Sequence, residues 1–149
     1  MEESLHTWQQ FVNARQLLFE QNIIRTFNNP IEDFSEFLVS AVVKGRLARN
    51  VNQKDYDVET DEMSIQVKSV AKAPNNPNGY IVTARDRENQ LATHYAFCFF
   101  QNYVPSGLYI VNADFVRDFG RAQIKRHDLE VACQHTDLNF TVISVKWQQ

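Results

Sequence analysis

The sequence predicts a mixed α/β or α+β fold in which helices flank one central sheet. Three observations support this prediction. The chain opens with two stretches of helical periodicity, residues 55–70 alternate between apolar and polar residues, and short apolar runs bounded by turn residues follow. The chain has 149 residues, of which 44% are hydrophobic, and this size matches one domain. We therefore expect one domain over residues 1–149, with an N-terminal helical extension over 1–28 and a core over 30–149.

Two helices are expected at the start of the chain. Residues 4–27 lack glycine and proline, and their apolar residues recur at helical spacing. These residues include Trp8, Phe11, Val12 and Leu18. Asn29 and Pro30 then suit an N-cap followed by proline at the first helical position, so a second helix is expected over about 30–48. This helix is apolar on two sides, which predicts burial between layers.

A β-hairpin is expected over residues 55–70, with one apolar and one polar face. Gln66 and Lys68 alternate with Ile65 and Val67, which is the pattern of a half-buried strand. The preceding run has the same alternation. The hairpin therefore presents its polar side chains together on one face.

The turn of this hairpin decides which residues lie opposite each other. Both a two-residue turn and a four-residue loop, centred between Asp61 and Glu62, place Asp57 opposite Gln66. Lys68 lies one step further along the same face. A carboxylate, a side-chain amide and an ammonium group should therefore converge.

The remaining elements are short and separated by turn residues. The expected order is a loop over 72–79, a short strand over 80–83 continuing as a helix over 85–92, a buried strand over 94–102, a turn over 105–107, a strand over 108–113, a short helix ending near Gly120, and a last strand over 140–147.

The polar face of the hairpin suits a hard-cation site. Magnesium prefers oxygen ligands, and Asp57 would supply a carboxylate, Gln66 its amide oxygen and Val67 its backbone carbonyl. Lys68 cannot bind a cation, but it can orient or help deprotonate an attacking water and offset charge on a phosphate oxygen. The reaction that suits these groups is the hydrolysis of a phosphodiester.

A further carboxylate comes from the second helix. Glu36 shares a helical stripe with Val43, so it is expected among groups partly removed from water, where it needs a partner or a metal. A solvated position at the rim of the helix is the alternative.

These residues resemble the PD-(D/E)XK nuclease superfamily, which has the restriction-endonuclease-like fold. In that family a β-hairpin carries an aspartate, then an acidic residue or glutamine, an apolar residue and lysine, and the preceding helix often adds a glutamate. The segments EFLVSAVVKG, YDV and IQVKS match these parts in order through Glu36, Asp57, Gln66 and Lys68. Tyr56 replaces the proline of the motif, and Gln66 replaces the second carboxylate, a variant that occurs in active members.

The resemblance implies a restriction-endonuclease-like core and a magnesium-dependent deoxyribonuclease. The metal, Mg²⁺ or Mn²⁺, would be held by Asp57, Gln66, Val67 and Glu36. The substrate would be double-stranded DNA, in the setting of defence or repair. One site cuts one strand, so cutting both implies a homodimer or a place in a larger complex.

Basic residues after the hairpin are candidates for contacting the DNA backbone. They are Lys72, Arg85 and Arg87. The net charge of −3 and the pI of about 5.8 give no general attraction to nucleic acid, and basic clusters are equally compatible with solvated loops.

Two alternatives to a nuclease stay open. An incomplete site would make the chain a nuclease-fold module that binds nucleic acid or a protein partner, and both the acidic pI and Gln66 favour this interpretation. Gln66 and Lys68 would otherwise be only the solvated face of an edge hairpin.

The composition indicates a protein of the reducing cytoplasm without a membrane partner. Cys98 and Cys133 have no metal-ligand spacing and predict neither a disulfide framework nor a zinc site. The longest apolar run, residues 95–100, is too short to cross a bilayer, and the N-terminus lacks a leader pattern.

Overall fold

The computed structural model describes residues 2–49, 56–72, 79–83, 91–101 and 103–134. Its elements are α1 (Glu2–Glu20), α2 (Pro30–Val43), β1 (Arg46–Leu47), β2 (Val58–Glu59), β3 (Ser64–Lys72), β4 (Tyr80–Val82), β5 (His94–Gln101), β6 (Val104–Asn112), α3 (Ala113–Asp118), β7 (Gln123–Lys125) and α4 (Arg126–Gln134). The helix expected over 85–92 falls mostly outside the described residues, and the strand expected over 140–147 falls entirely outside them.

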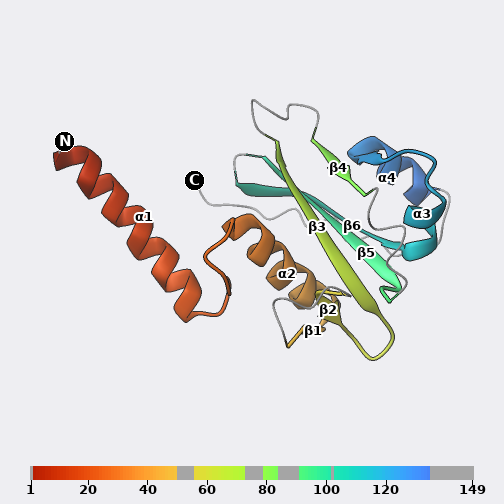
Figure 1. Cartoon of the computed structure of the whole chain (residues 1–149), viewed down its shortest axis with the longest axis horizontal. Coiled ribbons are helices and arrows are strands. Elements are labelled where there is room, and N and C mark those ends of the chain that lie inside the picture. Colours follow the sequence, from red (N-terminus) through yellow and green to blue (C-terminus); the bar gives the residue numbers. More distant parts are fainter. Residues whose placement is uncertain (1, 50–55, 73–78, 84–90, 102, 135–149) are drawn as a thin grey trace.

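The chain has the predicted mixed α/β architecture. The central sheet has five strands in the order β1-β2-β3-β5-β6, and β4 pairs with β7 in a separate two-stranded sheet. In the central sheet β3 and β5 are parallel, while the other neighbours are antiparallel. Figure 1 shows α2 on one face of this sheet and α3 and α4 on the other.

Both faces of the central sheet are buried, which explains the continuous apolar run of β5. Tyr95 and Phe97 belong to a core cluster that includes residues of α3, α4, β4 and β7. Ala96 and Cys98 point to the opposite cluster, which includes Val39 of α2. A strand that is covered on both faces has no side exposed to solvent, so its sequence does not alternate between apolar and polar residues.

The start of α2 follows the prediction, but its end does not. The Asn29 side chain accepts a hydrogen bond from the Ile31 backbone, and Pro30 takes the first helical position. The helix ends at Val43, five residues before the expected end, because Lys44 adopts a left-handed conformation with φ of 53°. The chain can then enter β1 immediately after Gly45.

The predicted hairpin register is confirmed. Val58 pairs with Ile65 across β2 and β3, and the connection is the four-residue loop. In this loop the Thr60 backbone donates to the Met63 carbonyl at 2.8 Å, and the Thr60 hydroxyl accepts from the Met63 backbone at 2.9 Å. A threonine hydroxyl thus replaces the glycine or asparagine that shorter turns prefer.

Two other boundaries differ from the sequence prediction. The turn expected over 105–107 is part of β6, where Pro105 pairs with Phe100 next to a register shift; proline is tolerated there because β6 is an edge strand of the sheet. The first helix ends at Glu20 instead of near residue 27, and Asn22 follows with a positive φ of 56°.

The helix α1 stands away from the sheet layers (Figure 1). Among the described residues, no helix combines the length and the apolar character needed to cross a membrane.

Candidate active site

The helix α2 and the β2–β3 hairpin enclose a cavity of about 290 Å³. All four side chains predicted to be catalytic line it. The lining residues are Glu32, Glu36, Asp57, Gln66, Val67, Lys68 and Ser69. The structure therefore brings together the groups that the hairpin register and the helical stripe predicted.

Asp57 lies directly before β2, and its backbone is held on both sides. Its N–H donates to the Ile65 carbonyl at 2.9 Å, and its carbonyl accepts from the Ala48 backbone at 2.8 Å. Its carboxylate oxygen Oδ2 accepts from the backbone N–H of Val67 at 2.7 Å. Hydrogen bonds to an ionised acceptor are strong, so this carboxylate has a defined position at the wall of the cavity.

The Gln66 side chain contacts Asp57, as expected. Its Nε2 donates to Oδ2 of Asp57 at 2.6 Å, so the nitrogen end of the amide faces the carboxylate. The role expected for Gln66 requires its oxygen to face a cation. A half-turn about the last side-chain torsion exchanges the two ends of the amide.

Val67 also contacts Asp57, and the ligand role expected for its carbonyl stays a prediction. Its backbone N–H, and not its carbonyl, makes the contact with Asp57. Lys68 follows on β3 and lines the cavity. Val67 and Lys68 therefore bring a backbone N–H donor and an ammonium group to the same cavity.

Glu36 is only 20% exposed and forms an ion pair with Arg25. Burial, and then the negative charge of Asp57, raise the pKa of Glu36 from its ordinary value of 4.5 to about 7, although Arg25 acts in the opposite direction. The prediction of a carboxylate partly removed from water is correct, and the solvated alternative is wrong. The partner that such a group needs is Arg25.

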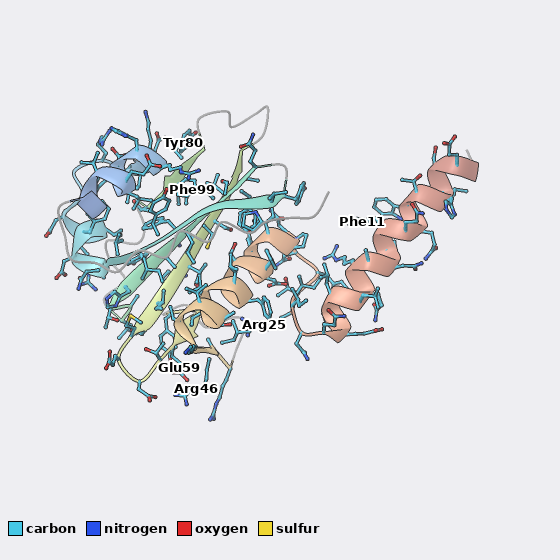
Figure 2. The ribbon with its side chains drawn as sticks, turned by 180° about the vertical axis from the view of Figure 1, so that it is seen from behind. Phe11, Arg25, Arg46, Glu59, Tyr80 and Phe99 are labelled. Carbon is cyan, nitrogen blue, oxygen red and sulfur yellow. The ribbon has the colours of Figure 1, made fainter. Side chains whose placement is uncertain are left out.

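Arg25 is a residue of the site that the sequence did not reveal. The buried carboxylate of Asp33 accepts from the backbone N–H groups of Arg25 and Thr26 at 2.9 and 2.7 Å, which ties this loop to the start of α2. The Arg25 side chain then reaches Glu36 and donates to the Ala48 carbonyl at 2.9 Å. Figure 2 shows Arg25 beside α2.

Sequence reasoning missed Arg25 because it assigned residues 4–27 to one helix. It also missed Glu32, which lines the cavity one helical turn before Glu36. The spacing of four residues between these glutamates places them on one helix face, and this was a readable signal.

The predicted nucleic-acid contacts fall largely outside the described residues. Lys72 is the last residue of β3, and its backbone pairs with Gln101 of β5, but its side chain is not described. Arg85 and Arg87 lie in the gap between residues 83 and 91.

The cavity is lined by three carboxylates, those of Glu32, Glu36 and Asp57, and by one side-chain amide, that of Gln66. Within the described ranges, no three histidine, cysteine, aspartate or glutamate side chains gather as a metal-ligand group. This agrees with the substitution of Gln66 for the second carboxylate of the motif. Comparison with protein-family models and with curated proteins gives no match to this chain.

Proposed function

We propose that this chain is a metal-dependent endonuclease that hydrolyses phosphodiester bonds of DNA. The observation that carries the proposal is the convergence of Glu36, Asp57, Gln66 and Lys68 in one cavity. A helix and a hairpin supply these groups in the order of the PD-(D/E)XK motif, and a parallel strand follows. A restriction-endonuclease-like core is part of the same proposal.

The donor chemistry of the cavity fits a divalent cation. Asp57 contributes to the raised pKa of Glu36, so the negative charge of Asp57 disfavours the ionised form of Glu36. A cation between them would remove this cost, and Mg²⁺ or Mn²⁺ accepts such oxygen ligands together with an amide or backbone oxygen. Asp57 and Glu36 would hold the ion, with Gln66 and the Val67 carbonyl completing the protein ligands.

When bound, the ion would polarise the phosphate and acidify a water molecule. The remaining work falls to the side chains of the chain itself. Lys68 would orient the attacking water and offset negative charge that develops on the phosphate. The Val67 N–H keeps the Asp57 carboxylate in place, and Arg25 holds Glu36 at the wall of the cavity.

The proposed substrate is double-stranded DNA, and the proposed setting is defence or repair in the cytoplasm. Lys72, Arg85 and Arg87 follow the hairpin in the sequence and would contact the backbone of the bound strand. Cleavage of both strands would require two copies of the site, in a homodimer or a larger complex.

A second candidate function is a nuclease-fold module that binds nucleic acid or a protein partner without cutting. The observation in its favour is the reduced acidic donor set, because Gln66 takes the place of a carboxylate. Fewer negative ligands weaken the hold on a cation.

Incubation of the purified protein with plasmid and Mg²⁺ or Mn²⁺ tests the proposal. The wild type should nick or linearise the plasmid, and Lys68→Ala and Asp57→Ala should lose at least about 100-fold in rate, because Lys68 acts on the reacting phosphate and Asp57 holds the cation. Lys125→Ala is a matched control, since Lys125 is an exposed lysine of the other sheet. Circular dichroism checks that the variants are folded.

The outcomes separate the candidates. A wild type that shifts DNA in a gel without cutting it supports the binding module. A wild type that binds neither cation nor DNA contradicts both. Equal cleavage by wild type and Lys68→Ala shows that the activity does not arise in this cavity.

A further inference from the structure

The Arg25 side chain connects two of the carboxylate residues that line the cavity. Its guanidinium forms the ion pair with Glu36 through Nη2, and it donates to the Ala48 carbonyl through Nη1 at 2.9 Å. The backbone N–H of Ala48 in turn donates to the Asp57 carbonyl at 2.8 Å. One side chain thus links α2, which carries Glu36, to the segment that holds the backbone of Asp57.

This connection is buried, and its starting point is anchored. The Arg25 side chain is only 19% exposed, and Ala48 is buried. The buried carboxylate of Asp33, which holds the backbone N–H groups of Arg25 and Thr26, also accepts from the Thr26 hydroxyl at 2.9 Å. Hydrogen bonds to an ionised acceptor are stronger than those between neutral groups. The Arg25 backbone therefore has a defined position from which the side chain reaches both of its partners.

The shape of an arginine side chain suits this position. A guanidinium group is planar and directs its N–H groups along fixed directions, whereas the lysine ammonium is a compact charge on a flexible stem. Nη1 and Nη2 of Arg25 can therefore hold a carbonyl and a carboxylate at a defined separation. Metal sites depend on such supporting contacts, and the loss of one typically costs about 10- to 100-fold in metal affinity.

We propose that Arg25 sets the cation selectivity of the cavity by fixing Glu36 relative to Asp57, an inference that rests on the proposed function. Mg²⁺ is small and requires a near-ideal octahedral arrangement of oxygen ligands, whereas Ca²⁺ is larger and accepts more ligands in flexible arrangements. A fixed pair of carboxylates favours the ion that demands exact geometry. Arg25 acts as a positioning residue, because it contacts a ligand residue and not the ion.

Calorimetric titration of the full chain with MgCl₂ and, separately, with CaCl₂ tests this proposal without DNA. Arg25→Lys keeps the positive charge but loses the planar guanidinium, so it should weaken Mg²⁺ binding by about 10- to 100-fold. Ca²⁺ binding should weaken much less, because this ion tolerates a displaced ligand. The ratio of the two dissociation constants is the quantity to compare, since a change in the charge or protonation of Glu36 affects both cations alike.

Arg117→Lys is the matched control for this substitution. Arg117 of α3 also donates to a carboxylate, that of Asp114 at 3.0 Å, and to a backbone carbonyl, that of Ala92 at 3.2 Å. It lies on the other face of the sheet, away from α2 (Figure 1). Its replacement should therefore leave both dissociation constants unchanged.

A second variant acts on the anchor of Arg25. Asp33→Asn removes the charge that holds the Arg25 backbone with little change in size. It should shift the ratio in the same direction as Arg25→Lys by a smaller factor, because the neutral amide is the weaker acceptor. Circular dichroism shows which variants are folded, and Asp33→Asn provides the test if Arg25→Lys is not.

The outcomes separate this inference from the proposed function. A wild type that binds neither cation overturns both. A wild type that binds Mg²⁺, with an unchanged ratio in the folded variants at positions 25 and 33, overturns the role of Arg25 alone. A loss of preference for Mg²⁺ in these variants but not in Arg117→Lys supports it.

Discussion

Replacing Glu36 with glutamine tests the electrostatics of the cavity without any assumption about catalysis. The pKa of Glu36 is about 7 in the folded protein and 4.5 in the unfolded chain. Burial is the larger cause and the negative charge of Asp57 the second, because both disfavour the ionised form. The folded protein therefore binds this proton more tightly than the unfolded chain. The resulting stabilisation is fully present below pH 4.5 and is lost as the pH rises through 7.

The magnitude follows from the two pKa values. At 1.36 kcal/mol for each unit of pKa, this carboxyl lowers the free energy of unfolding by about 2–3 kcal/mol between pH 5 and pH 8. A neutral glutamine has no proton to lose. The free energy of unfolding of Glu36→Gln, relative to the wild type, should therefore rise by about 2–3 kcal/mol over the same range.

Urea unfolding followed by circular dichroism at pH 5, 6, 7 and 8, in the presence of a chelator, measures this difference. The control Glu32→Gln removes an exposed carboxyl one turn earlier on α2, and its difference from the wild type should stay small across the series. Addition of Mg²⁺ or Mn²⁺ at pH 8 should restore stability to the wild type more than to Glu36→Gln. A difference between wild type and Glu36→Gln that stays constant from pH 5 to pH 8 would refute the reasoning.

Three further substitutions probe the site and its frame. Gln66→Glu should keep or raise cleavage and tighten Mn²⁺ binding in calorimetry, because it restores a second charge on the hairpin; a folded variant without activity would argue against the ligand role. Arg25→Ala should raise the pKa of Glu36 further, since Arg25 lowers it, and Arg25→Lys should lower this pKa again in part. The same urea series measures both variants, and a pH dependence of stability equal to that of the wild type would exclude an effect of Arg25 on Glu36. Gly45→Ala should lower the free energy of unfolding by about 1–3 kcal/mol, because the added Cβ would lie 2.6 Å from the Glu59 carbonyl. An unchanged melting temperature would show that β1 and β2 can move apart to accommodate the added methyl group without a cost in stability.

The predictable parts of this protein are those set by neighbours in the sequence. The alternation of Ile65, Gln66, Val67 and Lys68 assigns their faces, because side chains of a strand alternate whatever lies beyond it. The cap at Asn29 likewise marks the start of α2, since the cap bonds only to the first helical turn. The helix ends were less predictable, because a left-handed residue such as Lys44 carries no strong local signal.

The sequence by itself determined that an acid, an amide and an amine occupy the same side of one hairpin, since that outcome needs only strand periodicity and a turn of known length. Only the tertiary structure decided that Glu36 lies beside these groups with Arg25 as its partner, and that α1 leaves apolar side chains such as Trp8 and Phe11 exposed. Both results depend on contacts between segments far apart in the chain, such as Arg25 with Ala48. Side-chain periodicity describes which face of an element is apolar, but it does not state which other element will cover that face.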